Sequence, residues 1–179
     1  TAGLVAPGEQ PWTTAQGPTP SDNTGPGNAS HGDFYVFTEA SSTSNTPFIL
    51  ELVPLFPARL TVLQFSYHMH GSGMGNLSVE LAPADSTEAW QSIWSISGEQ
   101  HSSSGEAWQH VAVEIAPETA SFVRLHAVTG PDFMSDISID RLWVNCSGSD
   151  TLCSDAQALL GFKDSGDTDS DLLSWDRGS

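Results

Sequence analysis

The sequence predicts an all-β fold built from short antiparallel strands. From Phe34 to Asn145, hydrophobic and polar residues alternate with a period of two, which is the period of a strand with one buried face. Clusters of Gly, Pro, Asn and Ser interrupt the alternation at intervals of roughly 10–15 residues, and helical periodicity is absent from this region. Regularly spaced strands of this kind are typical of an antiparallel sandwich or barrel.

The elements follow in order along the chain. Residues 1–32 are rich in Pro, Gly, Ser, Thr and Asn, which predicts an extended or looping arm. Eight strands are expected after the arm, at residues 34–40, 47–55, 59–70, 76–83, 89–97, 107–116, 121–130 and 136–145. In the third and fourth of these, the residues predicted to face the core are Leu63, Phe65, Tyr67, Met69, Leu77, Val79 and Leu81.

The C-terminal part has a different character and is predicted to hold one short helix. Ser154 and Gln157 have the spacing of a capping box at a helix start. Leu159 and Leu160 belong to an apolar stripe, and Lys163 suits a helix C-terminus. The chain therefore divides into a β-sandwich over residues 1–146 and a small appendage over residues 147–179, which is too short to fold alone.

Composition and charge exclude several classes of function. The chain has 179 residues, of which 38% are hydrophobic, so it can build a core. No run approaches the ~20 apolar residues that a membrane-spanning helix needs. Residues 1–145 carry 15 acidic and 3 basic side chains, and residues 146–179 carry 7 and 2, which gives a net charge of −17 in all. A chain that is acidic throughout is not expected to bind nucleic acid or an anionic membrane, whereas cations and basic partners remain open.

The segment from Ser66 to Leu81, SYHMHGSGMGNLSVEL, is the part of the sequence that most suggests chemistry. His68 and His70 have a zinc-ligand spacing, but the sequence assures no third ligand. The glycines match neither a dinucleotide fingerprint nor a phosphate loop, and Ser72 is not in a nucleophile elbow. We therefore expect a glycine-rich hairpin between two core strands, and no spacing of Ser, His and Asp indicates an enzyme.

Two further groups of residues carry candidate sites. Asp140 interrupts an otherwise apolar strand, so it is expected either to pair with Arg141 or Arg124 or to bind Ca²⁺. Three glycosylation sequons begin at Asn28, Asn76 and Asn145. Cys146 and Cys153 are close enough in sequence to form a local disulfide, although each could pair elsewhere.

Several of these stretches resemble the MAM domain family, named for meprin, A5/neuropilin and receptor tyrosine phosphatase mu. The resemblance runs in order from Pro11 to Cys146, and its most specific part is the pattern Tyr-His-Met followed by spaced glycines and Leu77. Other parts of the resemblance are PWTTAQGPTPSDNTGP, GDFYVFTEAS, WQHVAVEI and DISIDRLWVNC. It implies a jelly-roll β-sandwich, extracellular and non-enzymatic, that serves adhesion or holds subunits together.

The resemblance also implies a structural cation and shows departures from the family. Carried over to this chain, the cation ligands would be Asp140 and Asp33, with Ca²⁺ as the ion. The family's N-terminal Cys-x-Phe-Glu is missing, and Val62 stands where a cysteine that would pair with Cys146 is usual. The sandwich is therefore expected to depend mainly on its hydrophobic core.

The C-terminal appendage resembles the start of the N-terminal cap of plant-type leucine-rich-repeat proteins, through CSDAQALLGFKDS and DLLSW. Such a cap seals the end of a repeat solenoid, and weak order is expected beyond about Leu152. Together these interpretations predict an interaction or adhesion module of a larger cell-surface or secreted protein, with a protein partner or self-association. The alternative is a calcium-dependent carbohydrate-binding jelly roll, which would need exposed aromatic rings among Trp90, Trp94, Trp108 and Trp143.

Overall fold

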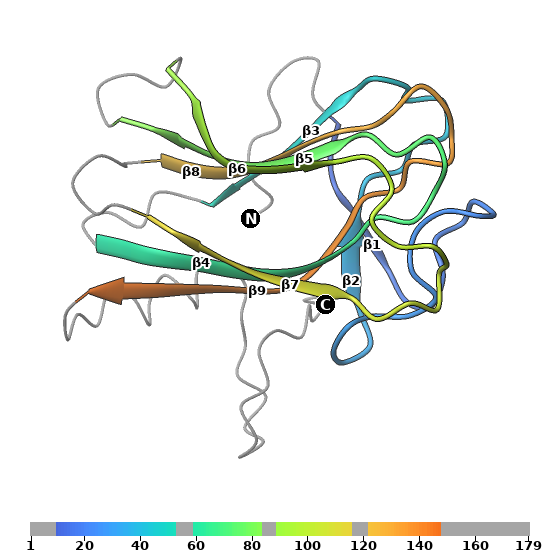
Figure 1. The fold of residues 1–179 in the computed structure, drawn as a ribbon, viewed down its shortest axis with the longest axis horizontal. Helices are drawn as coiled ribbons and strands as arrows, with labels where there is room; N and C mark the ends of the chain where they lie inside the picture. The colour runs from blue at the N-terminus through green and yellow to red at the C-terminus, as the bar shows by residue number, and fades with distance from the viewer. Residues whose placement is uncertain (1–9, 53–58, 84–88, 116–121, 148–179) are drawn as a thin grey trace, which may run out of the picture.

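The fold is a sandwich of two antiparallel β-sheets, seen in a computed structural model that describes residues 10–52, 59–83, 89–115 and 122–147 (Figure 1). The nine strands are β1 (Thr13–Ala15), β2 (Tyr35–Phe37), β3 (Pro47–Leu52), β4 (Arg59–His68), β5 (Asn76–Ala82), β6 (Gln91–Ser97), β7 (Gln109–Glu114), β8 (Phe122–Val128) and β9 (Ser138–Ser147). All eight expected strands are present, as β2 to β9. The described residues include no helix that is long and apolar enough to cross a membrane.

The chain passes repeatedly from one sheet to the other. One sheet has five strands in the order β1-β2-β9-β4-β7, and the other has four in the order β3-β8-β5-β6. Only β1–β2 and β5–β6 are neighbours both in sequence and within a sheet, so most connections cross the edge of the sandwich. The antiparallel two-sheet sandwich that the sequence predicts is confirmed, with the crossing connections of a jelly roll. The expected helical appendage lies outside the described residues and stays a prediction.

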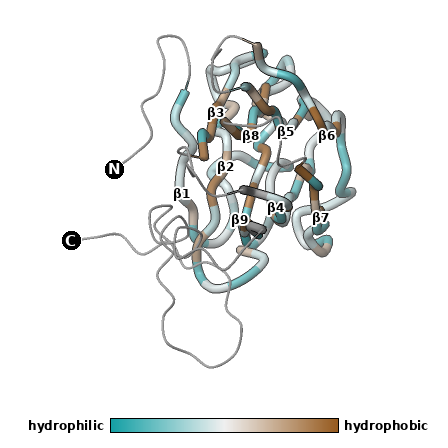
Figure 2. Tube along the Cα trace, turned by 90° about the vertical axis from the view of Figure 1, so that its left-hand side faces the viewer, coloured by the Kyte–Doolittle hydropathy of each residue, from teal (hydrophilic) through white to brown (hydrophobic). Residues whose placement is uncertain are grey.

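The hydrophobic core fills the space between the two sheets. The inward residues predicted for the third and fourth strands are all buried, with relative exposures of 0–9%. Figure 2 shows hydrophobic colour along strands of both sheets, as expected where alternate residues face a shared core. The largest fully buried side chains are Tyr35, Phe37, Phe48, Phe65, Leu63, Met69, Leu77, Leu125, Ile137, Ile139, His68 and His101.

The prediction of a hairpin at the glycine-rich segment is wrong. β4 belongs to the five-stranded sheet and β5 to the four-stranded sheet, so residues 69–75 carry the chain from one sheet to the other. The glycines are needed because this connection lies against residues 128–135. A side chain at Gly75 would overlap the carbonyl of Val128, and one at Gly71, where φ is 144°, would overlap the carbonyl of Met134. Alternation identifies the inward residues of a strand but not its partner, which is why the error arose.

The arm that precedes the strands is part of the folded structure. Thr13–Ala15 forms β1 and pairs with β2. The following residues reach the outer face of the five-stranded sheet, where the Ser30 hydroxyl lies 3.4 Å from that of Ser66 and the His31 amide donates to Asp140. This covering explains why Ser66 is fully buried, and His68 is buried against the rings of His101 and Trp108, although both residues lie on the face of their strand opposite the predicted core residues.

Candidate functional site

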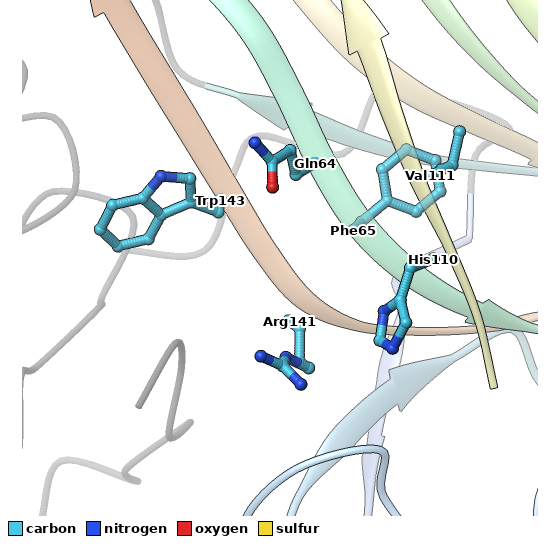
Figure 3. A pocket seen from close by; sticks show the side chains of 6 residues that line it. All are labelled: Gln64, Phe65, His110, Val111, Arg141 and Trp143. Atoms are coloured by element: carbon cyan, nitrogen blue, oxygen red, sulfur yellow. The ribbon is translucent and has the colours of Figure 1, made fainter. Parts of the chain in front are cut away.

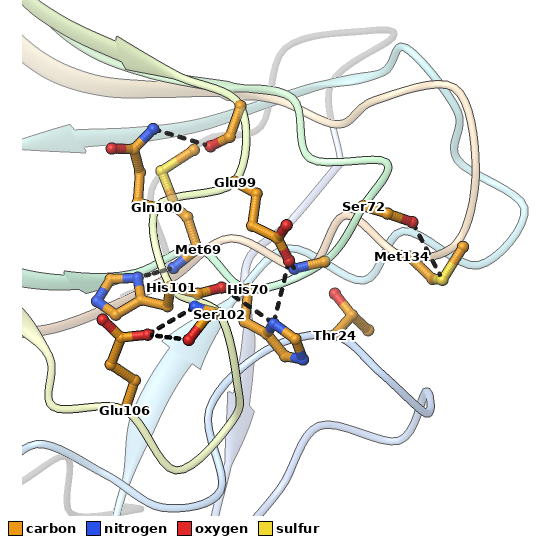
Figure 4. Close-up of polar contacts among 12 residues, drawn as sticks. Thr24, Met69, His70, Ser72, Glu99, Gln100, His101, Ser102, Glu106 and Met134 are labelled. Carbon is orange, nitrogen blue, oxygen red and sulfur yellow. Dashed lines mark hydrogen bonds and ion pairs between the residues drawn. The ribbon is translucent and has the colours of Figure 1, made fainter.

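The two histidines of the glycine-rich segment have different environments. His68 is fully buried and stacks on His101, with ring centroids 4.0 Å apart. His70 lies at the surface side, where its Nδ1 is 3.1 Å from the carbonyl of His101 and 3.2 Å from Glu99 (Figure 4). Within the part of the chain that the structure describes, no three His, Cys, Asp or Glu side chains form a group that could hold a metal.

Burial keeps the stacked histidines neutral at physiological pH. Burial, helped by the nearby His101 and His70, lowers the pKa of His68 to about 4, and burial also lowers the pKa of His101. The Nδ1 of His101 accepts a hydrogen bond from the amide of Met69, which places any proton of the neutral ring on Nε2. Both ring nitrogens of His68 and the Nε2 of His101 are buried without a hydrogen-bond partner among the described residues. The pair therefore acts as a flat, neutral part of the core.

Asp140 anchors an irregularity in β9. The register passes from Gln64↔Trp143 to Ser66↔Asp140, so Phe65 faces two residues of β9 and the strand bulges. Arg141, the extra residue, has a φ of 52°, a backbone conformation that residues other than glycine rarely adopt. One Asp140 oxygen accepts the amide of Arg141 at 2.7 Å and the other accepts the amide of His31 at 2.9 Å. Asp140 therefore fixes the bulge and ties the arm to it.

Asp140 was expected either to pair with Arg141 or Arg124 or to bind Ca²⁺, and these contacts bear on the expected pairing. Arg124, one of the expected partners, instead pairs with Glu80 at 2.7 Å on the other sheet. The pairing of Asp140 with Arg124 is therefore wrong, and backbone amides rather than a guanidinium satisfy its two oxygens. Burial raises the pKa of Asp140, an effect that the amides of His31 and Arg141 oppose. Asp33, the second expected Ca²⁺ ligand, is exposed.

Asp136 is a buried carboxylate that was not singled out from the sequence. Asp136 is fully buried, and one of its oxygens accepts the amide of Ala40 at 3.0 Å. The other oxygen is buried without a partner among the described residues. Burial raises the pKa of Asp136 to about 6; the Ala40 amide and the nearby Thr19 hydroxyl oppose this rise, and Glu39 adds to it. An oxygen in this state is the kind of group that a bound cation would stabilise. Its sequence signal was only a second aspartate four residues before Asp140.

A pocket opens on the outer face of the five-stranded sheet, with a cavity volume of about 330 Å³ (Figure 3). Its lining residues come from β4, β7 and β9 and are Gln64, Phe65, His110, Val111, Arg141 and Trp143. The side chains of Phe65 and Val111 belong to the core or pack against it. The polar side chains of Gln64, His110 and Arg141 therefore give the pocket its chemistry, beside the indole of Trp143.

The four tryptophans considered for sugar stacking lie in different environments. Trp94 packs against the core, and the guanidinium of Arg124 covers the ring of Trp90 at 4.0 Å. The indole of Trp108 donates to the carbonyl of Asn28 at 3.0 Å and lies edge-on to Tyr35. Trp143 alone among these four lines the pocket, and its indole N–H donates to Asn145 at 2.7 Å.

Comparisons with known proteins assign the chain to a family. The model of the family described as MAM domain, meprin/A5/mu matches residues 6–148. The chain belongs to the MAM domain family. This MAM domain is 31% identical over 139 residues to the human MAM domain-containing glycosylphosphatidylinositol anchor protein 1, covering 72% of the chain and 14% of that protein. It is 32% identical over 133 residues to human MAM domain-containing protein 2, covering 72% of the chain and 19% of the relative. The chain thus spans less than a fifth of the length of these relatives.

Solved structures show the same fold at low sequence identity. The MAM domain superposes on the K1 cleaved adhesin domain of Lys-gingipain from Porphyromonas gingivalis W83 with a TM-score of 0.52 and 14% identity, covering 76% of this chain and 91% of that one. For the K2 adhesin domain, the TM-score is 0.50 at 14% identity, covering 83% and 94% of the two chains. At this identity the likeness concerns the fold alone.

The sequons and cysteines fall in different parts of the MAM domain. Asn28 and Asn145 are exposed, whereas Asn76 is half-buried at the start of β5, between β6 and β8. Cys146 lies in β9 opposite Leu60, and Cys153 is outside the described residues, so their disulfide stays a prediction.

Proposed function

We propose that this MAM domain is a non-enzymatic extracellular interaction module of a larger cell-surface or secreted protein, and that it binds a protein partner or a second copy of itself. The observation that carries the proposal is the family match over residues 6–148. One relative is named for a glycosylphosphatidylinositol anchor, which holds proteins on the outer face of the membrane. The small share of each relative that the chain covers supports a modular role.

The proposed module carries glycans at Asn28 and Asn145, where the exposed side chains suit attachment, and at Asn76. Residues 147–179 are proposed to begin a leucine-rich-repeat cap, with Cys146 and Cys153 as a local disulfide. Peptide mass mapping of the secreted chain, with and without glycan removal and reduction, tests the glycans and the disulfide. Unmodified sequons or free thiols in the secreted chain would contradict them.

The test of the leading function is whether clustered copies of the chain adhere. Beads coated with the chain should aggregate if it self-associates, and should stain cells in a protease-sensitive way if the partner is another protein. Phe133 is 48% exposed in the connection that precedes β9. Phe133→Ser is therefore the first variant whose aggregation and staining are compared with those of the natural chain, and Ile93→Ser, on β6 of the four-stranded sheet, is its control. If the beads show no aggregation and no staining of cells, the proposal is overturned.

The second candidate function is calcium-dependent carbohydrate binding. Trp143 in the pocket supports sugar binding, and the unpartnered oxygen of Asp136 supports a structural cation. We propose Asp136 as a ligand of this cation in place of the expected pair Asp140 and Asp33, because the three carboxylates form no common group among the described residues. Millimolar Ca²⁺ should raise the melting temperature relative to EDTA, and Asp136→Asn should abolish the difference. An identical melting temperature in Ca²⁺ and EDTA would reject the calcium site.

A further inference from the structure

We propose that the pocket of Gln64, His110, Arg141 and Trp143 binds a sugar that carries a single carboxylate, such as a hexuronic or sialic acid residue. This inference rests on the carbohydrate binding proposed above, without its dependence on Ca²⁺, and deepens it. It names the ligand class and the residues that select it, and it does not require Ca²⁺.

Arg141 supplies a positive charge that no other part of the described structure uses. The chain has only 5 basic residues against 22 acidic ones. Arg124 is paired with Glu80, whereas the guanidinium of Arg141 makes no hydrogen bond or ion pair with any residue that the structure describes. None of the six lining residues is acidic. A half-buried guanidinium without a partner is suited to a planar carboxylate, which it can bind with two parallel hydrogen bonds.

The backbone holds Arg141 in this position. As the extra residue of the β9 bulge, it has a φ of 52°, and Asp140 accepts its amide at 2.7 Å. Strained backbone conformations of this kind persist where the surroundings fix them, and they are common at ligand sites. The neighbouring carboxylate of Asp140 accepts the amides of Arg141 and His31 and forms no ion pair with the Arg141 guanidinium.

The other polar groups suit the hydroxyls and the apolar face of a sugar ring. Gln64 offers a donor and an acceptor, and His110 is exposed with its Nδ1 2.7 Å from the hydroxyl of Ser66. When Ser66 donates to Nδ1, the neutral ring carries its proton on Nε2, which can then donate to a ligand. Trp143 adds an aromatic surface whose orientation is fixed by its bond to Asn145.

Charge and size favour one monoanionic sugar over a larger or more highly charged ligand. A single guanidinium balances one negative charge, and the net charge of −17 repels phosphates and sulfated chains that carry more. The volume of about 330 Å³ lies at the lower end of the range for small-molecule pockets, which corresponds to about one or two sugar rings. A free acetate or sulfate ion would leave Gln64 and Trp143 unused.

The test is an NMR titration of the full chain in EDTA, following the indole N–H signals, with the Trp143 signal assigned from Trp143→Phe. Methyl glucuronoside and 3′-sialyllactose are compared with methyl glucoside, lactose, acetate, sulfate and N-acetylglutamate. We expect the carboxylated sugars to shift the Trp143 signal and to bind about tenfold or more tightly than the others. Arg141→Gln should reduce their affinity by about tenfold or more, and Arg141→Lys should retain part of it.

The controls separate this inference from the function on which it rests. Arg124→Gln removes an arginine that covers Trp90 outside the pocket and should leave the affinity unchanged. Ser147→Ala removes the sequon at Asn145 but keeps the amide beside Trp143, so it tests occupation of the pocket by the protein's own glycan. Equal binding of neutral and acidic sugars, unaffected by Arg141→Gln, would overturn the inference and leave carbohydrate binding standing. If no sugar binds in EDTA or in Ca²⁺, both this inference and carbohydrate binding are rejected. If acetate or sulfate binds as tightly as the sugars, the pocket is a site for small anions and the inference of a sugar ligand is rejected.

Discussion

Buried polar side chains in this sandwich are satisfied to different degrees, and the difference determines what each does for stability. Asp140 and Ser135 each accept two backbone amides. His68 has no partner for either ring nitrogen among the described residues, and Asp136 has none for one oxygen. The first pair holds the backbone in place, whereas the second pair makes the free energy of unfolding depend on pH.

His68 should make the fold less stable in acid. Its pKa falls from an ordinary value of 6.5 to about 4 in the folded state, so the unfolded chain binds more protons between these values. The free energy of unfolding contributed by His68 therefore falls as the pH is lowered from 6.5 to 4, by on the order of 3 kcal/mol. Denaturant unfolding from pH 7 to pH 4.5 measures it.

The variant His68→Phe keeps an aromatic ring against His101 and cannot titrate, so its free energy of unfolding should fall less than that of the natural chain, or rise, as the pH is lowered over the same range. The comparison with the natural chain is needed because Asp136 has the opposite effect. Its pKa rises from 3.8 to about 6 on folding, so its contribution falls as the pH increases from 3.8 to 6. Parallel pH profiles for the natural chain and His68→Phe would contradict the role of His68.

Ser135 should be important for the packing of the two glycine-containing loops. Its buried hydroxyl accepts the amides of Gly75, at 3.0 Å, and Gly130, at 2.6 Å. Ser135→Ala leaves both donors without an acceptor and should reduce the free energy of unfolding by about 1–3 kcal/mol. Ser72→Ala changes an exposed hydroxyl on the loop that carries Gly75 and should stay within about 0.5 kcal/mol of the natural chain. Equal losses of unfolding free energy for the two variants, measured by denaturant unfolding, would show that the Ser135 hydroxyl does not hold the two loops together.

At the scale of single elements, β9 depends on Asp140. Asp140→Ala removes the acceptor for the amides of His31 and Arg141, at a cost of roughly 1–3 kcal/mol for each donor. We expect the free energy of unfolding to fall by about 2–5 kcal/mol, and less for Asp140→Asn, which keeps one acceptor oxygen. Urea unfolding measures the loss, with Glu114→Ala on exposed β7 as the control. A loss in Asp140→Ala no larger than in the control would show that the bulge holds without the carboxylate.

Strands were predictable from the sequence where alternation ran for several residues, as it does in β4 and β5. β1 was missed because Thr13–Ala15 is three residues long and has no apolar alternation, so only its pairing with β2 makes it a strand. The pairing of β4 with β7 and β9 was not predictable, since a period of two specifies the face of each residue but not the neighbouring strand.

The candidate site was less predictable for the same physical reason. Its residues are brought together by register across three strands, with Ser66 opposite His110 and Gln64 opposite Trp143. Arg141 enters the pocket because of a bulge, and a bulge has no signature in the sequence DISIDRLWV. Asp140 was recognised as unusual because a carboxylate in an apolar strand needs donors, but one donor is the amide of His31 in the distant arm and the other is the amide of Arg141 at the bulge.

At the scale of the whole molecule, the net charge of −17 should make the stability of the sandwich depend on salt. Like charges repel more strongly when they are held close together, so the folded state loses more than the unfolded state. Salt shortens the distance over which the charges interact, from about 30 Å at 0.01 M to about 3 Å at 1 M. The melting temperature should therefore rise as NaCl is increased over this range in EDTA.

Replacing NaCl by choline chloride should give the same rise, because screening does not depend on the identity of the cation, whereas a rise with NaCl alone would indicate a specific site. A melting temperature that stays constant or falls with both salts would show that charge repulsion does not limit the stability of this fold.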